Sequence, residues 1–352
     1  MSINRLETNA FGSPESLAIM DHATRFAASL GLRFPIFQAP VGGAAGPELA
    51  TAVSQAGGLG ALALTWTSLE DTQRSVAEVK KRTQKPFQIN FVLAFEPKPL
   101  RCALEAGVRV VTFSWGIPAG EEIALVRSYG ASYGLQVTTI DGAKRALDIG
   151  ADFLICQGVE AGGHVQATRS VWEILPQIIS RAQTVPVVAS GGIGNGKGIA
   201  RALSIGASGA MLGTRFVATQ ESLAHELYKR RLVEAKTEDA VLTVCFDLGW
   251  PYAAHRVLGN STLAMWEAAG CPPSGKRPGE GDRTATDRTG RSFFRYQFVS
   301  PRADMTGDPE AMCLPAGMSC GEIRDVPSVK EVVERLWREC ESEWKLIANQ
   351  LG

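Results

Sequence analysis

A single histidine ends a glycine-rich turn near the middle of the chain. The turn is QGVEAGGH at residues 157–164, and it follows an apolar run at 152–156. An imidazole with an ordinary pKa near ~6.5 can exchange a proton close to neutral pH, so His164 is a candidate general base. A loop histidine that only hydrogen-bonds fits the same pattern, and its position in the sequence favours neither interpretation.

Two further glycine-rich turns have the chemistry of a phosphate site. They are SGGIG at 190–194 and GTR at 213–215, and each follows an apolar run. Glycines let backbone N–H groups approach a phosphate closely, and a threonine adds a hydroxyl. One such turn indicates only a tight connection, but two in succession favour phosphate binding. The run GGIGNG lacks the spacing of a dinucleotide fingerprint. The expected phosphate contacts come from Gly191, Gly192, Gly213 and Thr214.

Other side chains at the ends of apolar runs could complete a site. Asn90 and Gln157 are amides that need hydrogen-bond partners if they are buried. A flavin ring offers such partners, and so does a neighbouring loop. Trp66 and Trp115 could line an apolar pocket. Cys156 is better interpreted as a buried apolar residue, because no base adjoins it in the sequence.

A repeating pattern of apolar runs and amphipathic segments must position these residues. The runs predict strands at 35–39, 59–64, 86–91, 109–114, 133–138, 152–156, 186–190 and 209–212. Helices are expected at 47–56, 69–82, 100–106, 119–129, 141–149, 170–182 and 196–205. Runs that are apolar throughout are typical of strands buried on both faces. The pattern favours an α/β fold, a (β/α)8 TIM barrel, over a doubly wound sheet. The turns described above would meet at its catalytic face.

The rhythm changes after residue 216. A helix is expected at 219–235 and a loop at 270–290, where Pro, Gly and charged residues are frequent. Apolar residues spaced by three, four and seven predict a last helix at 328–349. We therefore expect residues 30–218 together with 321–352 to form the barrel, 219–320 to form an inserted cap over its catalytic face, and 1–29 to form an N-terminal arm.

The remaining histidines lie outside the repeats. His22 is expected to be exposed, and the role of His225 is open. His255 adjoins Arg256 and lies close to Trp250 and Tyr252, a grouping that fits either cap packing or a substrate entrance.

Composition excludes several classes of function. The 352 residues include 36 Lys and Arg against 36 Asp and Glu, so the formal net charge is zero. A balanced charge argues against nucleic acid as the main partner. The sequence contains no run of ~18 apolar residues, so no membrane helix is expected. Charged residues near the start of the sequence argue against a signal peptide. The 7 cysteines form no CxxC pair. We therefore expect a cytoplasmic enzyme of small molecules that has no metal site.

Several segments resemble one known family. PIFQAP, QINF, QGVEAGGH, GGIGNGKGIARALSIGASGAMLGTRF and HRVLGNST are similar to segments of nitronate monooxygenases, formerly called 2-nitropropane dioxygenases. The resemblance extends from about residue 30 to 270. It implies a barrel that binds flavin mononucleotide (FMN) and oxidises nitronates or nitroalkanes with O2 to carbonyl compounds and nitrite, as a monomer or homodimer. Flavin reductases of enoyl thioesters or quinones share these turns, so an NAD(P)H-dependent reductase is the alternative.

The resemblance also assigns roles to residues. His164 matches the catalytic histidine of the family. Val41, Asn195 and Gln166 depart from its usual Met, acidic residue and Gly, which bears on substrate and redox tuning rather than on the cofactor. The implied FMN contacts are Ala39, Pro40, Val41, Asn90, Gln157, Gly162, Gly191, Gly192, Met211, Leu212, Gly213 and Thr214.

Overall fold

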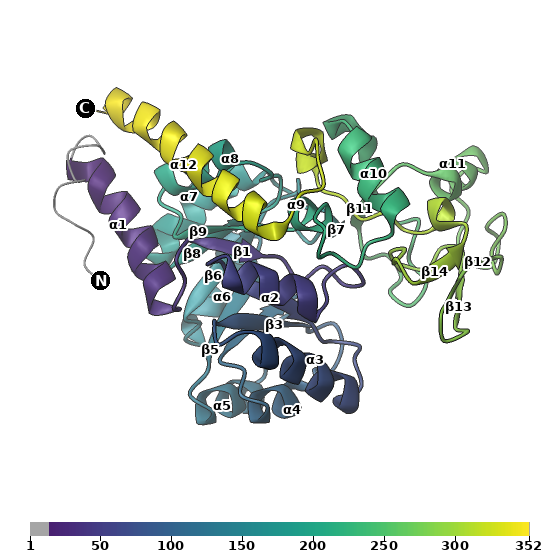
Figure 1. Ribbon diagram of the computed structural model, residues 1–352, viewed down its shortest axis with the longest axis horizontal. Helices are drawn as coiled ribbons and strands as arrows, with labels where there is room; N and C mark the ends of the chain where they lie inside the picture. Colours follow the sequence, from purple (N-terminus) through teal and green to yellow (C-terminus); the bar gives the residue numbers. More distant parts are fainter. Residues whose placement is uncertain (1–13, 352) are drawn as a thin grey trace.

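The structure, a computed structural model, describes residues 14–351 and consists of a barrel with a second part beside it (Figure 1). The strands of the barrel form an 8-stranded parallel sheet in the order β1-β9-β8-β6-β5-β4-β3-β2. A parallel bridge between Phe37 and Leu59 joins the two edges of this sheet. The predicted (β/α)8 barrel is confirmed. The strands are β1 (Ile36–Gln38), β2 (Gly60–Ala63), β3 (Phe87–Val92), β4 (Val110–Ser114), β5 (Ser132–Val137), β6 (Phe153–Gln157), β8 (Val187–Ser190) and β9 (Gly209–Leu212).

Helices cover the outside of the barrel, and local sequence fixes where several begin. Ser68, Thr139 and Asn195 each accept a hydrogen bond from a backbone N–H of the first turn that follows. The last helix, α12, packs against α8 and α2 and so completes the ring. The helices are α2 (Pro47–Gln55), α3 (Leu69–Arg82), α4 (Leu100–Glu105), α5 (Gly120–Ser128), α6 (Ile140–Asp148), α7 (Val171–Ala182), α8 (Gly196–Ser204) and α12 (Val329–Leu351).

Alternation along the strands separates two apolar layers. In β6, Leu154 and Cys156 join the cluster between strands and helices, whereas Phe153 and Ile155 join a second cluster with Phe37. Successive side chains of a strand point to opposite faces, so Gln157 shares the face of Phe153. Burial raises the pKa of the Cys156 thiol to about 12, so this cysteine is an unreactive core residue.

The N-terminal segment supplies a helix that packs against the inner cluster. Helix α1 (Pro14–Ser29) carries Phe26, whose ring centroid lies 5.9 Å from that of Phe37 and 5.7 Å from that of Phe153. His22 on the same helix lies 3.0 Å from the Ser208 hydroxyl through Nε2 and is only partly exposed. The described part of the arm thus packs against the barrel.

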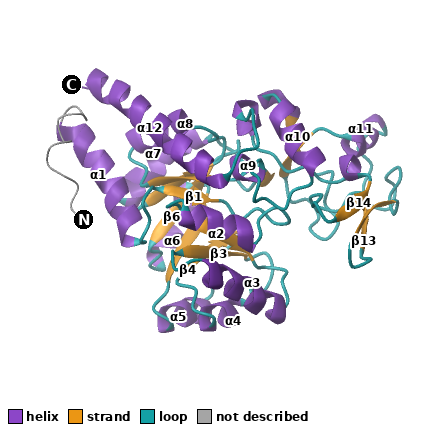
Figure 2. Cartoon of the chain, in the orientation of Figure 1, coloured by secondary structure: helices purple, strands orange, loops and turns teal. Residues whose placement is uncertain are grey.

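Residues between the short helix α9 (Thr214–Val217) and α12 form the second part, which we call the cap. Its regular elements are short and are joined by long loops (Figure 2). Its helix α10 covers Glu226–Glu234 only, shorter than predicted, and β12 (Arg283–Asp287) lies within the expected loop at 270–290. The other elements are β10 (Ala240–Thr243), β11 (His255–Leu258), α11 (Ser261–Ala268), β13 (Ser292–Phe294), β14 (Met305–Gly307) and the 3-10 helices η2 (Thr237–Asp239), η3 (Pro309–Ala311) and η4 (Met318–Glu322).

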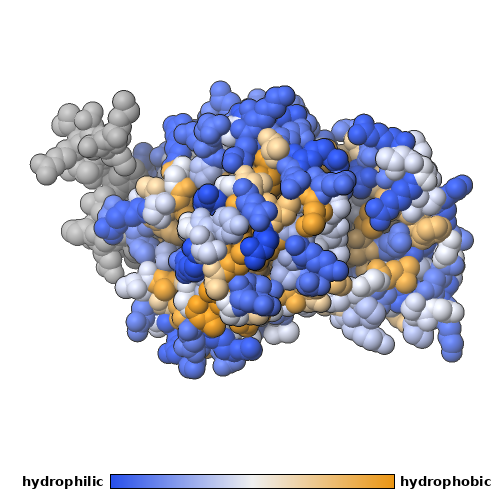
Figure 3. Space-filling view, turned by 90° about the horizontal axis from the view of Figure 1, so that it is seen from below, coloured by the Kyte–Doolittle hydropathy of each residue, from blue (hydrophilic) through white to orange (hydrophobic). Residues whose placement is uncertain are grey.

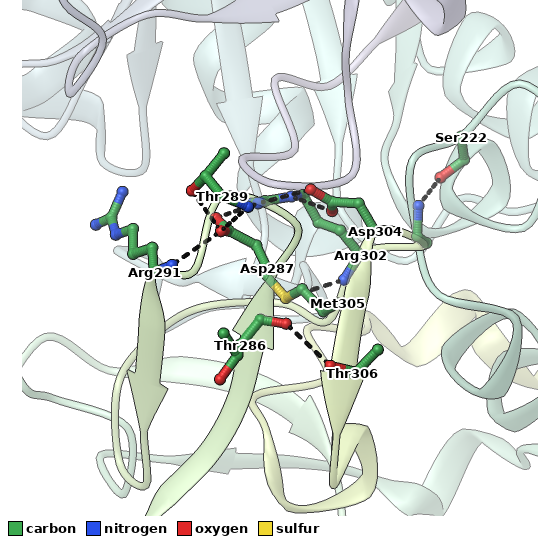
Figure 4. A network of polar contacts seen from close by, with 10 residues as sticks. Ser222, Thr286, Asp287, Thr289, Arg291, Arg302, Asp304, Met305 and Thr306 are labelled. Atoms are coloured by element: carbon green, nitrogen blue, oxygen red, sulfur yellow. Dashed lines mark hydrogen bonds and ion pairs between the residues drawn. The ribbon is translucent and has the colours of Figure 1, made fainter.

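A polar network holds the sheet of β13, β12 and β14 together (Figure 4). The Asp287 carboxylate accepts hydrogen bonds from the backbone N–H of Thr289 at 2.9 Å and of Arg291 at 3.1 Å. It also pairs with the Arg302 guanidinium at 3.4 Å. The carboxylate therefore closes the turn between β12 and β13 and links it to the strand that follows.

Hydrophilic residues cover most of the face seen in Figure 3, and hydrophobic residues form only scattered patches there. Among residues 14–351, no helix has the length and apolar character needed to cross a membrane. The same residues contain no group of three or more His, Cys, Asp or Glu side chains arranged to bind a metal ion.

We predict that Phe26→Ala destabilises the barrel. Truncating a ring packed against two others should lower the free energy of unfolding by about 3 kcal/mol, measured by urea denaturation. Leu346→Ala is the control, because Leu346 is 59% exposed on α12 and should change stability by less than about 0.5 kcal/mol. Equal losses in the two variants would show that α1 does not support the barrel.

Candidate active site

The turns after β1 and β9 lie against each other at one end of the barrel. The backbone N–H of Ala39 donates to the carbonyl of Leu212 at 2.9 Å. A Cβ built on Gly213 would lie 3.4 Å from the Ala39 Cβ and 3.5 Å from Val41 Cγ2. Pro40 lies between these two residues and is half-buried. The structure thus brings the predicted contacts of the first and last strands together.

The turns after β6 and β8 make a second close contact. Gly191 and Gly192 have φ angles of 103° and 69°, in the left-handed region that favours glycine. A Cβ on Gly192 would lie 2.7 Å from the Glu160 Cβ, so no side chain fits there. The Glu160 carboxylate accepts hydrogen bonds from the Ser170 hydroxyl and from the Val171 N–H at the start of α7. Glu160 is therefore a structural residue that fixes the position of this turn.

Backbone donors remain unpaired on the adjacent turns after β8 and β9. Within residues 14–351, the N–H groups of Gly192 and Thr214 donate no hydrogen bond. The Thr214 hydroxyl accepts a hydrogen bond from the Gly317 N–H at 2.9 Å, which leaves its own hydrogen free to donate. Donors of this kind on neighbouring turns suit a phosphate group. Arg215 does not add to them, because its buried guanidinium pairs with Asp325 at 3.1 Å.

The cap contributes backbone to this site. A Cβ on Gly162 would lie 2.3 Å from the Gly317 nitrogen, so the two segments touch through backbone atoms alone. The Met318 N–H donates to the Glu160 carbonyl at 3.0 Å. Sequence reasoning missed Gly317, since nothing in the local sequence links it to residues more than a hundred positions earlier.

His164 lies in a short strand that belongs to the cap sheet. Strand β7 (Gly163–His164) pairs antiparallel with β11, and His164 stands opposite His255. Its ring centroid lies 4.0 Å from that of Phe298, 4.3 Å from that of Trp250 and 6.1 Å from that of Trp115. The catalytic histidine implied by the resemblance is therefore enclosed by aromatic rings.

This enclosure controls the charge of His164. Burial, and secondarily the neighbouring His255, lowers the pKa of the imidazole to about 3. Its Nε2 atom is buried and has no hydrogen-bond partner within the described residues. The resting imidazole is therefore neutral at physiological pH, and one ring nitrogen remains available to a ligand.

The two predicted amides make different contacts. Gln157 donates from Nε2 to the His164 carbonyl at 3.3 Å and accepts at Oε1 from the Gln166 N–H at 2.9 Å. It therefore clamps the strand that carries His164. Asn90 donates from Nδ2 to the Thr112 carbonyl and hydroxyl, each at 3.2 Å.

The last strand divides its two predicted contacts between layers. Met211 packs in the inner cluster of the barrel, and Leu212 packs in the outer one. The Leu212 side chain thus faces the helices.

The cap histidines are structural. His255 is fully buried, with Nδ1 2.9 Å from the Ala253 carbonyl and Nε2 accepting from the Phe246 N–H at 3.1 Å. These contacts assign a neutral ring with its proton on Nδ1, and burial lowers its pKa. His225 is the N-cap of α10 and accepts from the Leu227 N–H. The two hydrogen bonds of the His255 ring therefore fit cap packing, one of the two interpretations that the sequence left open.

Aromatic residues extend outward from His164. The Trp250 ring lies 4.7 Å from that of Trp115 and 5.3 Å from that of Phe95, which in turn lies 5.2 Å from Trp66. Trp66 is 61% exposed, so the row reaches the surface. Sequence reasoning named Trp66 and Trp115 but missed Phe95 and Phe298, since single aromatic residues in loops carry no signal of their own.

Comparison with known proteins agrees with this arrangement. A family model described as nitronate monooxygenase matches residues 24–339. A nitronate monooxygenase from Pseudomonas aeruginosa is 31% identical over 300 residues, which cover 71% of this chain and 83% of that protein. A (3aS,4S,5R,7aS)-5-hydroxy-7a-methyl-1-oxo-octahydro-1H-indene-4-carboxyl-CoA dehydrogenase from Mycobacterium tuberculosis is 31% identical over 339 residues, which cover 87% and 93%.

Solved structures extend the likeness to three dimensions. A nitroalkane oxidase from Streptomyces ansochromogenes superposes with a TM-score of 0.74 at 28% identity, over 91% of this chain and 99% of that one. A FabK variant from Thermotoga maritima superposes with a TM-score of 0.76 at 28% identity, over 93% and 99%. Fold and site together define a barrel oxidoreductase of the flavoenzyme class. The chain belongs to the nitronate monooxygenase family.

We predict that the enclosure of the His164 ring makes the protein sensitive to acid. Its folded pKa is lowered to about 3, so its contribution to stability is fully present above the unfolded value of ~6.5 and is lost as the pH falls. At about pH 5 this loss should amount to about 2 kcal/mol relative to about pH 7.5. Urea unfolding at both pH values should show a smaller loss in His164→Gln than in the wild type. His22→Gln is the control and should keep the wild-type difference. A loss in His164→Gln as large as in the wild type would contradict the assignment.

Proposed function

We propose that the protein is an FMN-dependent nitronate monooxygenase that oxidises alkyl nitronates with O2 to carbonyl compounds and nitrite. The observation that carries this proposal is the neutral, enclosed imidazole of His164 at the phosphate-binding end of a barrel of this family. The proposal is compatible with either a monomer or a homodimer.

The residues on the turns fit FMN. Gly192 and Thr214 present unpaired N–H groups, and the Thr214 hydroxyl retains a free hydrogen. One cradle of this kind suits a single phosphate, as in a mononucleotide. Ala39, Val41 and Gly213 lie together beside it and would contact the flavin. Bound FMN would supply the electron acceptor that nitronate oxidation requires.

His164 would act on the substrate as a neutral base or hydrogen-bonding group. A pKa of about 3 excludes a preformed imidazolium at neutral pH, so the resting ring does not attract an anion by charge. Gln157 holds the backbone from the His164 carbonyl to the Gln166 N–H, directly after this ring, through its two amide atoms. Phe298 and Trp250 exclude water from Nε2, which keeps the nitrogen free for the substrate.

The second candidate function is an FMN-dependent reductase of enoyl thioesters or quinones that uses NAD(P)H. The M. tuberculosis carboxyl-CoA dehydrogenase favours a thioester substrate, because its name gives a CoA thioester and it matches 87% of this chain. The purified protein should release FMN rather than FAD on denaturation. Oxygen uptake with propionate-3-nitronate and alkyl nitronates then tests the proposed nitronate monooxygenase activity. Rapid bleaching of the flavin by NADH under anaerobic conditions, with no nitronate turnover, would favour the second.

We predict that Gly213→Glu loses the flavin while the barrel stays folded. The carboxylate would place negative charge beside the phosphate, so flavin absorbance per protein should fall at least about tenfold while the far-UV circular dichroism persists. Gly213→Ala is the matched control, since its added Cβ would make only ordinary contacts of 3.4 and 3.5 Å. Full flavin occupancy in the glutamate variant would exclude this position from the cofactor site.

We predict that His164→Ala keeps FMN and loses turnover. General base catalysis is typically worth ~10²- to 10⁴-fold, so kcat with a neutral nitroalkane should fall in that range. A preformed nitronate needs no deprotonation, so its loss should be smaller if His164 acts only as a base. Steady-state oxygen uptake with both substrates on one variant separates the roles. Unchanged rates with both substrates would leave His164 as a loop residue without a catalytic role.

A further inference from the structure

Trp250 connects the enclosure of His164 to the aromatic row that reaches the surface. Its ring contacts His164 at 4.3 Å, Trp115 at 4.7 Å and Phe95 at 5.3 Å between centroids. Trp115 and Phe95 come from barrel loops and His164 from β7, whereas Trp250 comes from the cap. One cap side chain thus covers the imidazole on the side of the exposed row.

The segment that carries Trp250 is fixed at both ends and weakly held between them. At one end the Leu248 N–H donates to the Tyr296 carbonyl at 3.3 Å, and at the other the Ala254 carbonyl accepts from the Val165 N–H at 2.8 Å. Between them, within the described residues, the backbone of residues 249–252 makes only local hydrogen bonds inside 247–253. Gly249 has a φ of 96°, and Tyr252 has a φ of 63° and is 87% exposed. Exposed backbone with few buried side chains opens at low cost in free energy, and left-handed φ angles mark positions that can absorb such a change.

The other aromatic cover of His164 is more firmly anchored. Phe298 follows Gln297, which forms a parallel bridge with Leu248, and the buried Tyr296, whose hydroxyl donates to the Pro278 carbonyl at 2.7 Å. A substrate that reaches Nε2 of His164 must displace one of the two covering rings. The weaker attachment of the Trp250 segment makes it the one that moves.

We propose that residues 249–252 form a lid in which Trp250 gates access to His164, and that the opened lid selects nitronates that carry an aromatic ring next to the reacting carbon. This choice of substrate class rests on the proposed function. A ring that enters while the lid opens meets Trp115 and Phe95, whose edges and faces already pair with the Trp250 indole. Aromatic pairs of this kind are worth more than their buried area alone, so an aryl group gains more than a short alkyl chain.

The gate is tested first without any turnover. The chain has only 4 histidines, so labelled histidine gives a simple nuclear magnetic resonance titration, with His164 identified by its absence in His164→Gln. If Trp250 keeps water from the ring, Trp250→Ala should raise the pKa of His164 by about one unit or more toward ~6.5. Trp250→Phe should keep most of the shift and guards against misfolding in the alanine variant. Leu346→Ala is the control, because this exposed residue lies on α12, outside the lid, and should leave the titration unchanged.

Specificity is tested with two nitronates, those of phenylnitromethane and nitroethane. Trp115→Ala should lower the ratio of kcat/KM for the aryl over the alkyl nitronate by roughly 2- to 10-fold, the value of one lost aromatic pair. Trp115→Phe should keep most of the ratio, and Leu346→Ala should keep all of it.

The outcomes separate the lid from the proposed function. An unchanged His164 titration in Trp250→Ala overturns the gate, and an unchanged aryl to alkyl ratio overturns the selection of aromatic substrates. If the wild type takes up no oxygen with either nitronate, the proposed function fails together with the substrate class. The titration still decides the gate in that case, since it needs no turnover.

Discussion

The candidate active site depends on a backbone contact between two glycines that lie far apart in the sequence. Gly162 belongs to the turn after β6 and Gly317 to the cap, and a Cβ on Gly317 would lie 2.9 Å from the Gly162 nitrogen. Only residues without side chains allow this approach. The contact brings the Gly317 N–H to the Thr214 hydroxyl and the Met318 N–H to the Glu160 carbonyl. The docking of the cap and the geometry of the phosphate turns are therefore one structural feature.

The two ends of the candidate site differ in polarity. The proposed phosphate end presents polar backbone groups on glycine turns, whereas the His164 end presents aromatic rings. The nearby buried guanidinium groups pair elsewhere: Arg215 binds Asp325, and Arg256 donates to the carbonyls of Val159 and Ala240. Within residues 14–351 His164 forms no ion pair with an acidic side chain, so burial rather than ion pairing sets its protonation state.

The strand that carries His164 explains how a loop residue becomes rigid. Gly163 and His164 leave the barrel and pair with Arg256 and His255 of the cap, and Gln157 holds the same stretch from below through its amide. Residues on loops usually move more than the elements that they connect. Here the cap sheet supplies the missing hydrogen bonds, so the imidazole is as well positioned as one on a barrel strand.

Local patterns in the sequence were sufficient for the barrel. Apolar runs buried on both faces marked all eight strands of the sheet, and the amphipathic segments between them marked the helices that cover it. The turns at 190–194 and 213–215 were recognisable because glycine has a specific conformational use, which the left-handed φ of Gly192 bears out. These features depend on residues that are adjacent in the chain, so they can be recognised from the sequence alone.

Only the tertiary structure decided what surrounds those residues. The length of α10, the strand at Arg283–Asp287 and the contacts of Phe298 and Gly317 depend on pairings across the cap, which no local period encodes. The charge of His164 also could not be predicted from local sequence, because its pKa depends on rings contributed by three separate segments. Residue type and spacing thus determined the fold and the candidate base, and burial, which exists only after folding, determined the protonation state of that base.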